Sequence, residues 1–193
     1  HIPEVEVTYQ GNIAVVRLLQ FGQTTNDKLR GVMEDVQKEH PKGVILDLRN
    51  NPGGLLHAAE VVVSNFLPKG SVFASIHTRE SVEEDVTEDA PTIDADVKLV
   101  VLVNKGSASA SEIVAGALQD AKRGTIIGEL TYGKGTVQQL TQLSDGSTLK
   151  MTIAEWKTPD GRKIDGVGIE PDIKVENSGD RDEQMLRALD ILR

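Results

Sequence analysis

Residues 97–113, VKLVVLVNKGSASASEI, decide the fold. The run VKLVVLV at 97–103 is a short, continuous apolar segment, typical of a strand buried on both faces of an α/β sheet. Small polar residues follow it, and the next stretch, to about residue 122, places apolar side chains at helical spacing: Ile113, Val114, Ala117, Leu118 and Ala121. The segment therefore predicts a buried strand, a turn and a helix.

The same order of elements recurs along the chain. The apolar run VILDLR at 44–49 ends in NNPGG and precedes a helical pattern from about 55 to 67. Further strands are predicted at 13–18, 71–78 and 124–129, and a helix at about 24–40. Strands that alternate with helices indicate an α/β fold with a mostly parallel sheet flanked by helices.

Three other segments complete the organisation. GKGTVQQLTQL and STLKMTIAEW flank Ser144-Asp145-Gly146, which predicts a late antiparallel hairpin. Residues 79–96 are acidic and poor in large apolar groups, so we expect an exposed loop there, and 180–193 reads as an amphipathic C-terminal helix. We interpret residues 1–193 as a single domain, since this length suits one hydrophobic core.

Composition excludes several classes of function. A net charge of -9 argues against nucleic-acid binding, and no apolar run approaches the roughly 18 residues of a membrane span. The absence of cysteine excludes a thiol nucleophile and zinc sites with thiolate ligands. The four histidines are scattered, and no phosphate-binding glycine motif is present. We therefore expect neither a metal nor a cofactor.

Three serines occupy alternate positions where the strand at 97–103 ends: Ser107, Ser109 and Ser111. Ser109-x-x-Glu112 matches a capping box, so Ser109 is predicted to cap the following helix. A helix N-terminus also favours negative charge, which suits a nucleophile. Residues 104–113 by themselves leave both roles open.

A serine nucleophile needs a base, and Lys134 in TYGKGTVQ is the candidate. A free lysine amine has a pKa of about 10.4 and is protonated at neutral pH, so a lysine base requires desolvation by apolar neighbours. In an extended segment Gln138 shares a face with Lys134, and its amide oxygen would orient the amine without adding charge. The alternative is an exposed lysine in a turn.

Taken together, LDLRNNPGG (46–54), VNKGSASASEI (103–113), GELTYGKGTVQ (128–138) and DGRKIDGVGIEPDI (160–173) resemble the tail-specific, or carboxyl-terminal processing, serine proteases. The resemblance covers most of the chain from about residue 11 onward. It implies a fold related to the crotonase and Clp protease folds, a spiral of β-β-α units.

The resemblance also implies a catalytic site. Ser109 would be the nucleophile, Lys134 the general base and Gln138 the residue that orients it. The amide of Ala110, with that of Gly53 or Gly54, would form the oxyanion hole. Asp47, Asn50 and Asn51 are interpreted as residues that shape the loops. Ser107 and Ser111 are interpreted as turn and helix hydroxyls, with a substrate contact by Ser107 as the alternative.

The implied activity is endopeptidase cleavage of polypeptides near an apolar C-terminal tail, outside the cytoplasm: in periplasm, in a lumen or at the cell surface. Family members usually carry a PDZ domain, for which this chain has no room, so we expect a protease core without one. The alternatives are a non-catalytic ligand- or peptide-binding module on the same scaffold, or a core inactive without its PDZ domain. The oligomeric state stays open.

Overall fold

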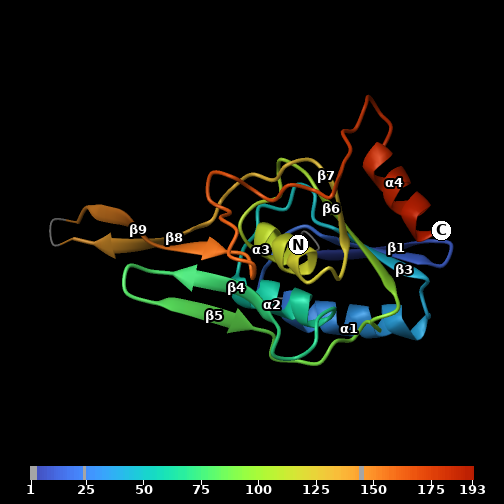
Figure 1. Cartoon of the computed structure of the whole chain (residues 1–193), viewed down its shortest axis with the longest axis horizontal. Coiled ribbons are helices and arrows are strands. Elements are labelled where there is room, and N and C mark those ends of the chain that lie inside the picture. Colours follow the sequence, from blue (N-terminus) through green and yellow to red (C-terminus); the bar gives the residue numbers. More distant parts are fainter. Residues whose placement is uncertain (1–3, 24, 144–145) are drawn as a thin grey trace.

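The computed structural model describes residues 4–23, 25–143 and 146–193. Within these residues the larger sheet has six strands in the order β1-β2-β3-β6-β7-β10 (Figure 1). The β1–β2 pair is antiparallel and every other neighbouring pair is parallel. The strands are β1 (Val5–Gln10), β2 (Ile13–Leu18), β3 (Gly43–Asp47), β6 (Lys98–Val103), β7 (Thr125–Gly128) and β10 (Ile173–Lys174).

Helices cover both faces of this sheet. Successive strand residues face opposite sides, so Val44 and Leu46 pack with α1 (Thr25–Lys38), α2 (Leu56–Ser64) and α3 (Ala110–Asp120). Ile45 instead packs with α4 (Glu183–Leu192) on the other face. Burial on both sides explains why the central strands are continuous apolar runs.

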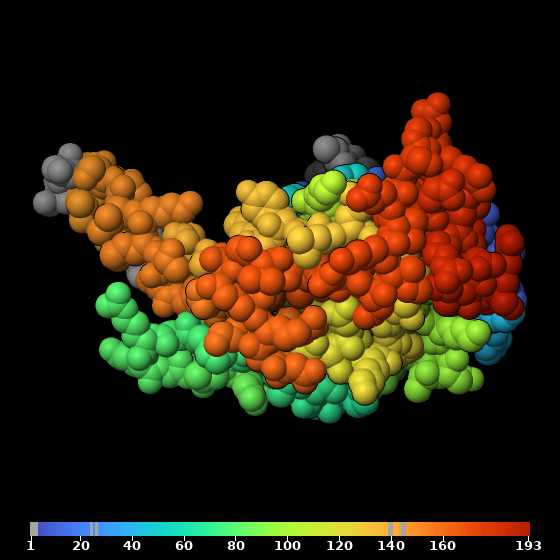
Figure 2. All heavy atoms as spheres, turned by 45° about the horizontal axis from the view of Figure 1, so that its top comes forward, coloured from blue at the N-terminus to red at the C-terminus, as the bar shows by residue number. Residues whose placement is uncertain are grey.

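A second sheet, entirely antiparallel, has the order β5-β4-β9-β8. Its strands are β4 (Val72–His77), β5 (Val82–Val86), β8 (Thr136–Gln142) and β9 (Thr148–Lys157). The β4 and β9 strands pair only over Ser75–His77 and Glu155–Lys157. Beyond that contact the two hairpins project from the body as separate arms (Figure 2).

The structure confirms the predicted fold class, a mostly parallel sheet flanked by helices with a late antiparallel hairpin. The expected loop at 79–96 is corrected in part, because Val82–Val86 form β5. This strand was missed because it lies at a sheet edge and its residues are mostly exposed and acidic, which hides the period-two pattern. The predicted turn residues Ser144 and Asp145 lie outside the described residues.

The C-terminal helix α4 falls within the range expected for it, and Asp182 caps it by accepting a hydrogen bond from Met185 N–H. In the part of the chain that the structure describes, no helix has the length and apolar character that crossing a membrane requires.

Candidate active site

Two loops that follow neighbouring parallel strands meet at the carboxyl edge of the large sheet. The loop after β3 carries NNPGG and the loop after β6 carries NKGSAS. Asn50 N–H donates to Asn104 Oδ1 (2.9 Å), and Asn104 Nδ2 donates to Asn50 Oδ1 (3.0 Å). These bonds fix the two loops against each other, at the place where α/β sheets commonly form sites.

The three alternate serines have different environments. Ser107 and Ser111 are fully buried, and each hydroxyl donates to a backbone carbonyl: Ser107 to Leu48 O (2.8 Å) and Ser111 to Asn51 O (3.0 Å). Both hydroxyls thus serve the loop structure, as expected. Ser109 is half-buried and lines a cavity of about 450 Å³.

Ser109 also has an unusual backbone. Its φ of 54° and ψ of -117° lie outside the regions that L-residues ordinarily adopt. Such strain costs on the order of 1–3 kcal/mol and is concentrated at functional sites, including the sharp strand-to-helix turns that present nucleophilic serines. Ser109 is the N-cap of α3, so its side chain lies at the positive end of that helix.

Glu112 connects the serine loop to the lysine loop. Its carboxylate is fully buried, and Oε2 accepts from both Ser109 N–H (2.9 Å) and Lys134 N–H (2.8 Å). Oε1 accepts from Thr131 Oγ1 and from Gly133 N–H, each at 2.6 Å. Glu112 thus supplies its half of the predicted capping box, while Glu112 N–H donates to Ser109 O (2.9 Å) and the Ser109 side chain makes no cap hydrogen bond. The same carboxylate also holds the segment that carries Lys134.

The two positions that flank Lys134 require glycine for different structural reasons. Gly133 has a φ of +87°, which favours glycine, and its carbonyl accepts from Gly166 N–H (2.9 Å). Gly135 lies so close to the backbone of Asp165 that a Cβ would collide with it. The turn thereby fixes the Lys134 backbone, while the Lys134 side chain is exposed.

Ser109, Ala110, Lys134 and Gln138 line the same cavity. No direct hydrogen bond joins the Lys134 amine to Ser109 Oγ or to Gln138 among the described residues. Gln138 Nε2 instead donates to Thr152 Oγ1 (2.7 Å) and to Thr136 Oγ1 (3.2 Å), which leaves its Oε1 available as an acceptor. The apolar lining residues are Leu56, Ile113, Val137 and Trp156.

The NPGG loop brings glycine backbone close to Ser109. A Cβ built on Gly53 would lie 2.8 Å from Ser109 Cβ and 2.9 Å from Ala110 N. Gly53 N–H donates to Asn51 Oδ1 (2.9 Å), and Asn51 is itself buried and donates to Leu18 O. In the described chain the N–H groups of Gly54 and Ala110 have no such partner, and both residues line the cavity.

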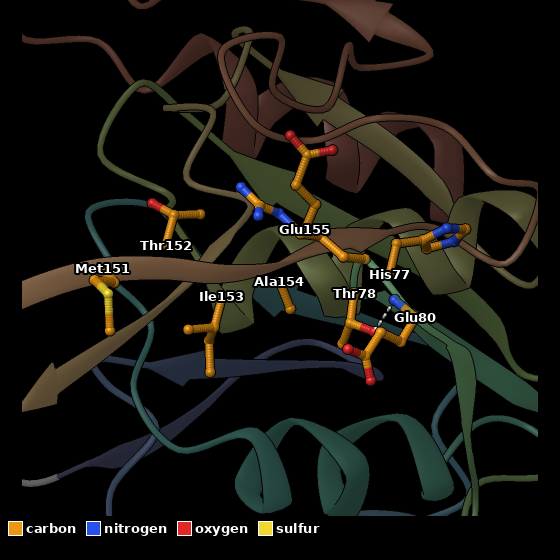
Figure 3. A pocket seen from close by; sticks show the side chains of 9 residues that line it. His77, Thr78, Glu80, Met151, Thr152, Ile153, Ala154 and Glu155 are labelled. Atoms are coloured by element: carbon orange, nitrogen blue, oxygen red, sulfur yellow. Dashed lines mark hydrogen bonds between the residues drawn. The ribbon is translucent and has the colours of Figure 1, made fainter.

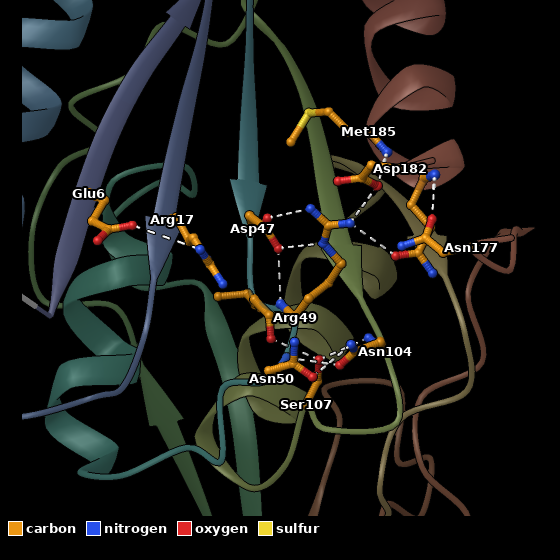
Figure 4. A network of polar contacts seen from close by, with 12 residues as sticks. Glu6, Arg17, Asp47, Arg49, Asn50, Asn104, Ser107, Asn177, Asp182 and Met185 are labelled. Atoms are coloured by element: carbon orange, nitrogen blue, oxygen red, sulfur yellow. Dashed lines mark hydrogen bonds and ion pairs between the residues drawn. The ribbon is translucent and has the colours of Figure 1, made fainter. Parts of the chain in front are cut away.

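A partly buried ion-pair network supports the base of this loop (Figure 4). Arg49 makes two side-chain hydrogen bonds to Asp47 (2.7 and 2.9 Å) and one to Asp182 (2.7 Å), at the start of α4. Burial acts to lower the pKa of the Arg49 guanidinium, but the hydrogen bonds that it donates to Asp47 and Asp182 outweigh burial and raise that pKa. The loop after β3 is thus tied to the C-terminal helix.

A second cavity, of about 720 Å³, lies between the turn after β4 and residues 151–155 of β9 (Figure 3). His77 lines it and its Nε2 lies 3.0 Å from Ser75 Oγ. This cavity shares no lining residue with the cavity at Ser109.

Among the described residues, no group of three or more His, Asp or Glu side chains is arranged to hold a metal ion.

The sequence pattern did not reveal three features of the site: the reach of Glu112 to the lysine loop, the contact of Arg49 with α4, and Lys150 of β9 in the wall of the Ser109 cavity. The bond between Glu112 and Lys134 and the contact of Arg49 with Asp182 join residues far apart in sequence. For the third feature, the position of Lys150, the sequence does hold a signal: the predicted hairpin pairs the strand of Lys150 with the strand of Gln138.

Comparison with known proteins now identifies the family. The family model described as peptidase family S41 matches residues 12–175. The carboxy-terminal-processing protease of Bartonella bacilliformis is 46% identical over 182 residues, which cover 91% of this chain and 41% of the relative. A "Probable CtpA-like serine protease" of Staphylococcus epidermidis is 39% identical over 176 residues, covering 91% of this chain and 36% of the relative.

A solved structure agrees with this assignment. The photosystem II D1 C-terminal processing protease superposes with a TM-score of 0.83 and 36% identity, covering 91% of this chain and 49% of that one. A lipoprotein from Streptococcus agalactiae, at 19% identity and a TM-score of 0.77, shares the fold. The chain spans about two-fifths of the length of the curated relatives it matches. It belongs to peptidase family S41.

Proposed function

We propose that this chain is the catalytic part of a serine endopeptidase in which Ser109 is the nucleophile and Lys134 the general base. One observation carries the proposal: of three alternate serines, only Ser109 lines the cavity that Lys134 also lines, and it does so in a strained conformation at a helix N-terminus. Ser107 and Ser111 have their hydroxyls committed to carbonyls.

The chemistry follows from these two groups. The neutral Lys134 amine takes the proton of Ser109 Oγ as the oxygen attacks a peptide carbonyl carbon, and the C–N bond then breaks. The Lys134 ammonium returns that proton to the departing amine. In the second half Lys134 takes a proton from water as the water oxygen attacks the ester carbonyl, and the acyl–oxygen bond breaks as the Lys134 ammonium gives that proton to Ser109 Oγ.

The oxyanion of each tetrahedral intermediate needs N–H donors that are not already bonded. Among the residues that the structure describes, Ala110 N–H and Gly54 N–H have no acceptor, whereas Gly53 N–H donates to Asn51 Oδ1. We therefore assign the second donor to Gly54 and a shaping role to Gly53. Removing one such donor typically costs about 2.7–4 kcal/mol of transition-state stabilisation.

Because the Lys134 side chain is exposed, we propose that substrate binding helps to activate it as a base. A polypeptide bound across Leu56, Val137 and Trp156 would exclude water from the amine, and desolvation favours the neutral form of a lysine. Gln138 Oε1 would accept from the amine and orient it toward Ser109. The pairing is not preformed, as is common for catalytic hydrogen bonds without substrate.

The names of the relatives support a substrate class. Proteins described as carboxy-terminal-processing proteases are similar to this chain over nearly all of its length. We propose that the whole protein cleaves polypeptides near apolar C-terminal tails, and that it acts outside the cytoplasm. The apolar wall of the Ser109 cavity suits such a tail.

Hydrolysis of unfolded casein tests the proposal. Ser109→Ala and Lys134→Ala should each abolish cleavage, whereas Ser81→Ala and Lys69→Ala, at exposed positions away from the cavity, should cleave like the unsubstituted chain. Cleavage that persists in both site variants contradicts the assignment. A chain inert in every form favours a non-catalytic binding module.

A further inference from the structure

The wall of the Ser109 cavity contains a second lysine that the proposed chemistry does not use. Lys150 lies on β9, opposite Leu140 of β8, and lines the cavity together with Lys134 and Gln138. Side chains alternate along a strand, so Lys150 and Thr152 share a face of β9, and Thr152 accepts from Gln138 Nε2. Lys150 therefore belongs to the face of the hairpin that bears Gln138.

The charge balance of the cavity is unusual for this protein. The chain carries a net charge of -9, yet none of the described residues that line the cavity is Asp or Glu. Lys150 makes no ion pair and no side-chain hydrogen bond within the described residues, and Glu112, whose carboxylate joins the serine and lysine loops, is already committed to four donors. Lys150 and the N-terminus of α3 thus give the cavity a positive potential even when Lys134 acts as a neutral base.

The Lys150 ammonium has no partner among the described residues, and the rest of the cavity wall is partly apolar. Such a cavity favours a ligand that carries an anionic group next to apolar groups. Polypeptides offer a carboxylate for this, as a chain terminus or as an Asp or Glu side chain. A cavity of about 450 Å³ taken as a sphere is about 10 Å across, the length of about three extended residues. A carboxylate held at Lys150 would therefore lie close to the bond at Ser109.

We propose that Lys150 binds a carboxylate of the polypeptide substrate within about three residues of the bond that Ser109 attacks. The inference rests on the proposed function because it takes the Ser109 cavity as the substrate site. Its consequence is that the catalytic cavity itself selects substrates whose cleaved segment is short and ends in a free carboxylate, or carries an acidic side chain there.

Binding to the Ser109→Ala chain tests this without turnover. Trp156 is the single tryptophan of the chain and lines the cavity, so its fluorescence reports occupancy. Three apolar hexapeptides of one parent sequence are titrated: the free acid, the C-terminal amide, and the amide with one of its last three residues changed to Glu. The acid should bind about fivefold more tightly than the amide, as expected for one partly exposed ion pair.

Adding Lys150→Gln should remove that preference, Lys150→Arg should keep it, and Lys69→Gln, at an exposed position away from the cavity, should leave it unchanged. Raising the salt concentration should shrink it. A Lys150-dependent gain for the Glu-containing amide alone would assign the carboxylate to a side chain and still support the proposal. Equal affinity of all three peptides, no binding of any, or a preference that survives Lys150→Gln overturns it.

The outcomes separate the two proposals. If casein is not cleaved but the acid preference depends on Lys150, the catalytic assignment fails and the carboxylate site stands. If Ser109 and Lys134 are required for cleavage but no acid preference exists, only the role of Lys150 fails.

Discussion

Replacing Glu112 with glutamine tests how the nucleophile and the base are held together. Glu112 accepts four hydrogen bonds, two from the serine–lysine side through Oε2 and two from Thr131 and Gly133 through Oε1. All four partners donate, which suits a carboxylate that only accepts. A glutamine presents one oxygen and one NH2 group in the same fully buried space, so two donors would then face a donor.

The expected loss in free energy of unfolding follows from the number of hydrogen bonds that the substitution removes. A hydrogen bond to a charged group contributes about 1.5–3 kcal/mol, so losing two predicts that unfolding becomes easier by about 3–6 kcal/mol. Domains of this kind are typically stable by only about 5–15 kcal/mol. We expect Glu112→Gln to remain folded at low temperature with a sharply lower unfolding midpoint, and to lose peptidase activity because the lysine segment is no longer fixed to Ser109.

Urea unfolding followed by circular dichroism, together with casein hydrolysis, measures both effects. Glu129→Gln is the control: Glu129 pairs with the exposed Lys105 at 2.9 Å, and removing such a pair should cost no more than about 1 kcal/mol. A Glu112→Gln variant within about 0.5 kcal/mol of the unsubstituted chain, or one as active as Glu129→Gln, would refute the role given to this carboxylate.

Two further predictions concern the loop after β3. Gly53→Ala should destabilise the chain more than Gly70→Ala and reduce activity, because both glycines have positive φ (+95° and +83°) but only at Gly53 would a Cβ meet Ala108 O at 2.6 Å; thermal melts and casein hydrolysis would show it, and equal losses would contradict the packing. Burial alone would raise the pKa of Asp182, but the hydrogen bonds that its carboxylate accepts from Arg49 and from Met185 N–H lower that pKa. The stabilisation by this carboxylate is therefore present above the unfolded pKa of about 3.9 and is lost as the pH falls through the lower folded pKa. Asp182→Asn should therefore flatten the fall in unfolding free energy below about pH 4, and a parallel fall in both proteins would count against the network.

The central sheet was predictable because its residues obey simple rules. VILDLR and VKLVVLV are buried on both faces and therefore read as continuous apolar strands, and the helices that follow them have a clear 3.6-residue pattern. The edge strands were harder. Val82–Val86 is acidic and largely exposed, which hides its strand pattern, whereas Val5–Gln10 is recognisable by the alternation of Val5, Val7 and Tyr9 with polar residues.

The candidate residues of the site could be named from the sequence pattern. How similar residues differ in backbone conformation and hydrogen bonding is seen only in the structure. Spacing distinguishes Ser109 only as a helix cap, through Glu112. Its distinction as a nucleophile comes from its backbone strain and from the carbonyls that Ser107 and Ser111 bond. Likewise the two glycines of NPGG are equivalent in sequence. They differ only because the Asn51 side chain folds back onto Gly53 N–H, a tertiary feature that spacing does not encode.

The most direct test of the account is the site of covalent capture. The chain is treated with a peptidyl phosphonate, which traps an activated serine as a stable ester, and the modified residue is located by mass spectrometry of its peptides. We predict modification of Ser109 and its loss in Lys134→Ala, with Ser107 and Ser111 unmodified. Capture at Ser75 beside His77, or at Ser109 with undiminished yield in Lys134→Ala, would contradict the central claim that Ser109 and Lys134 act together.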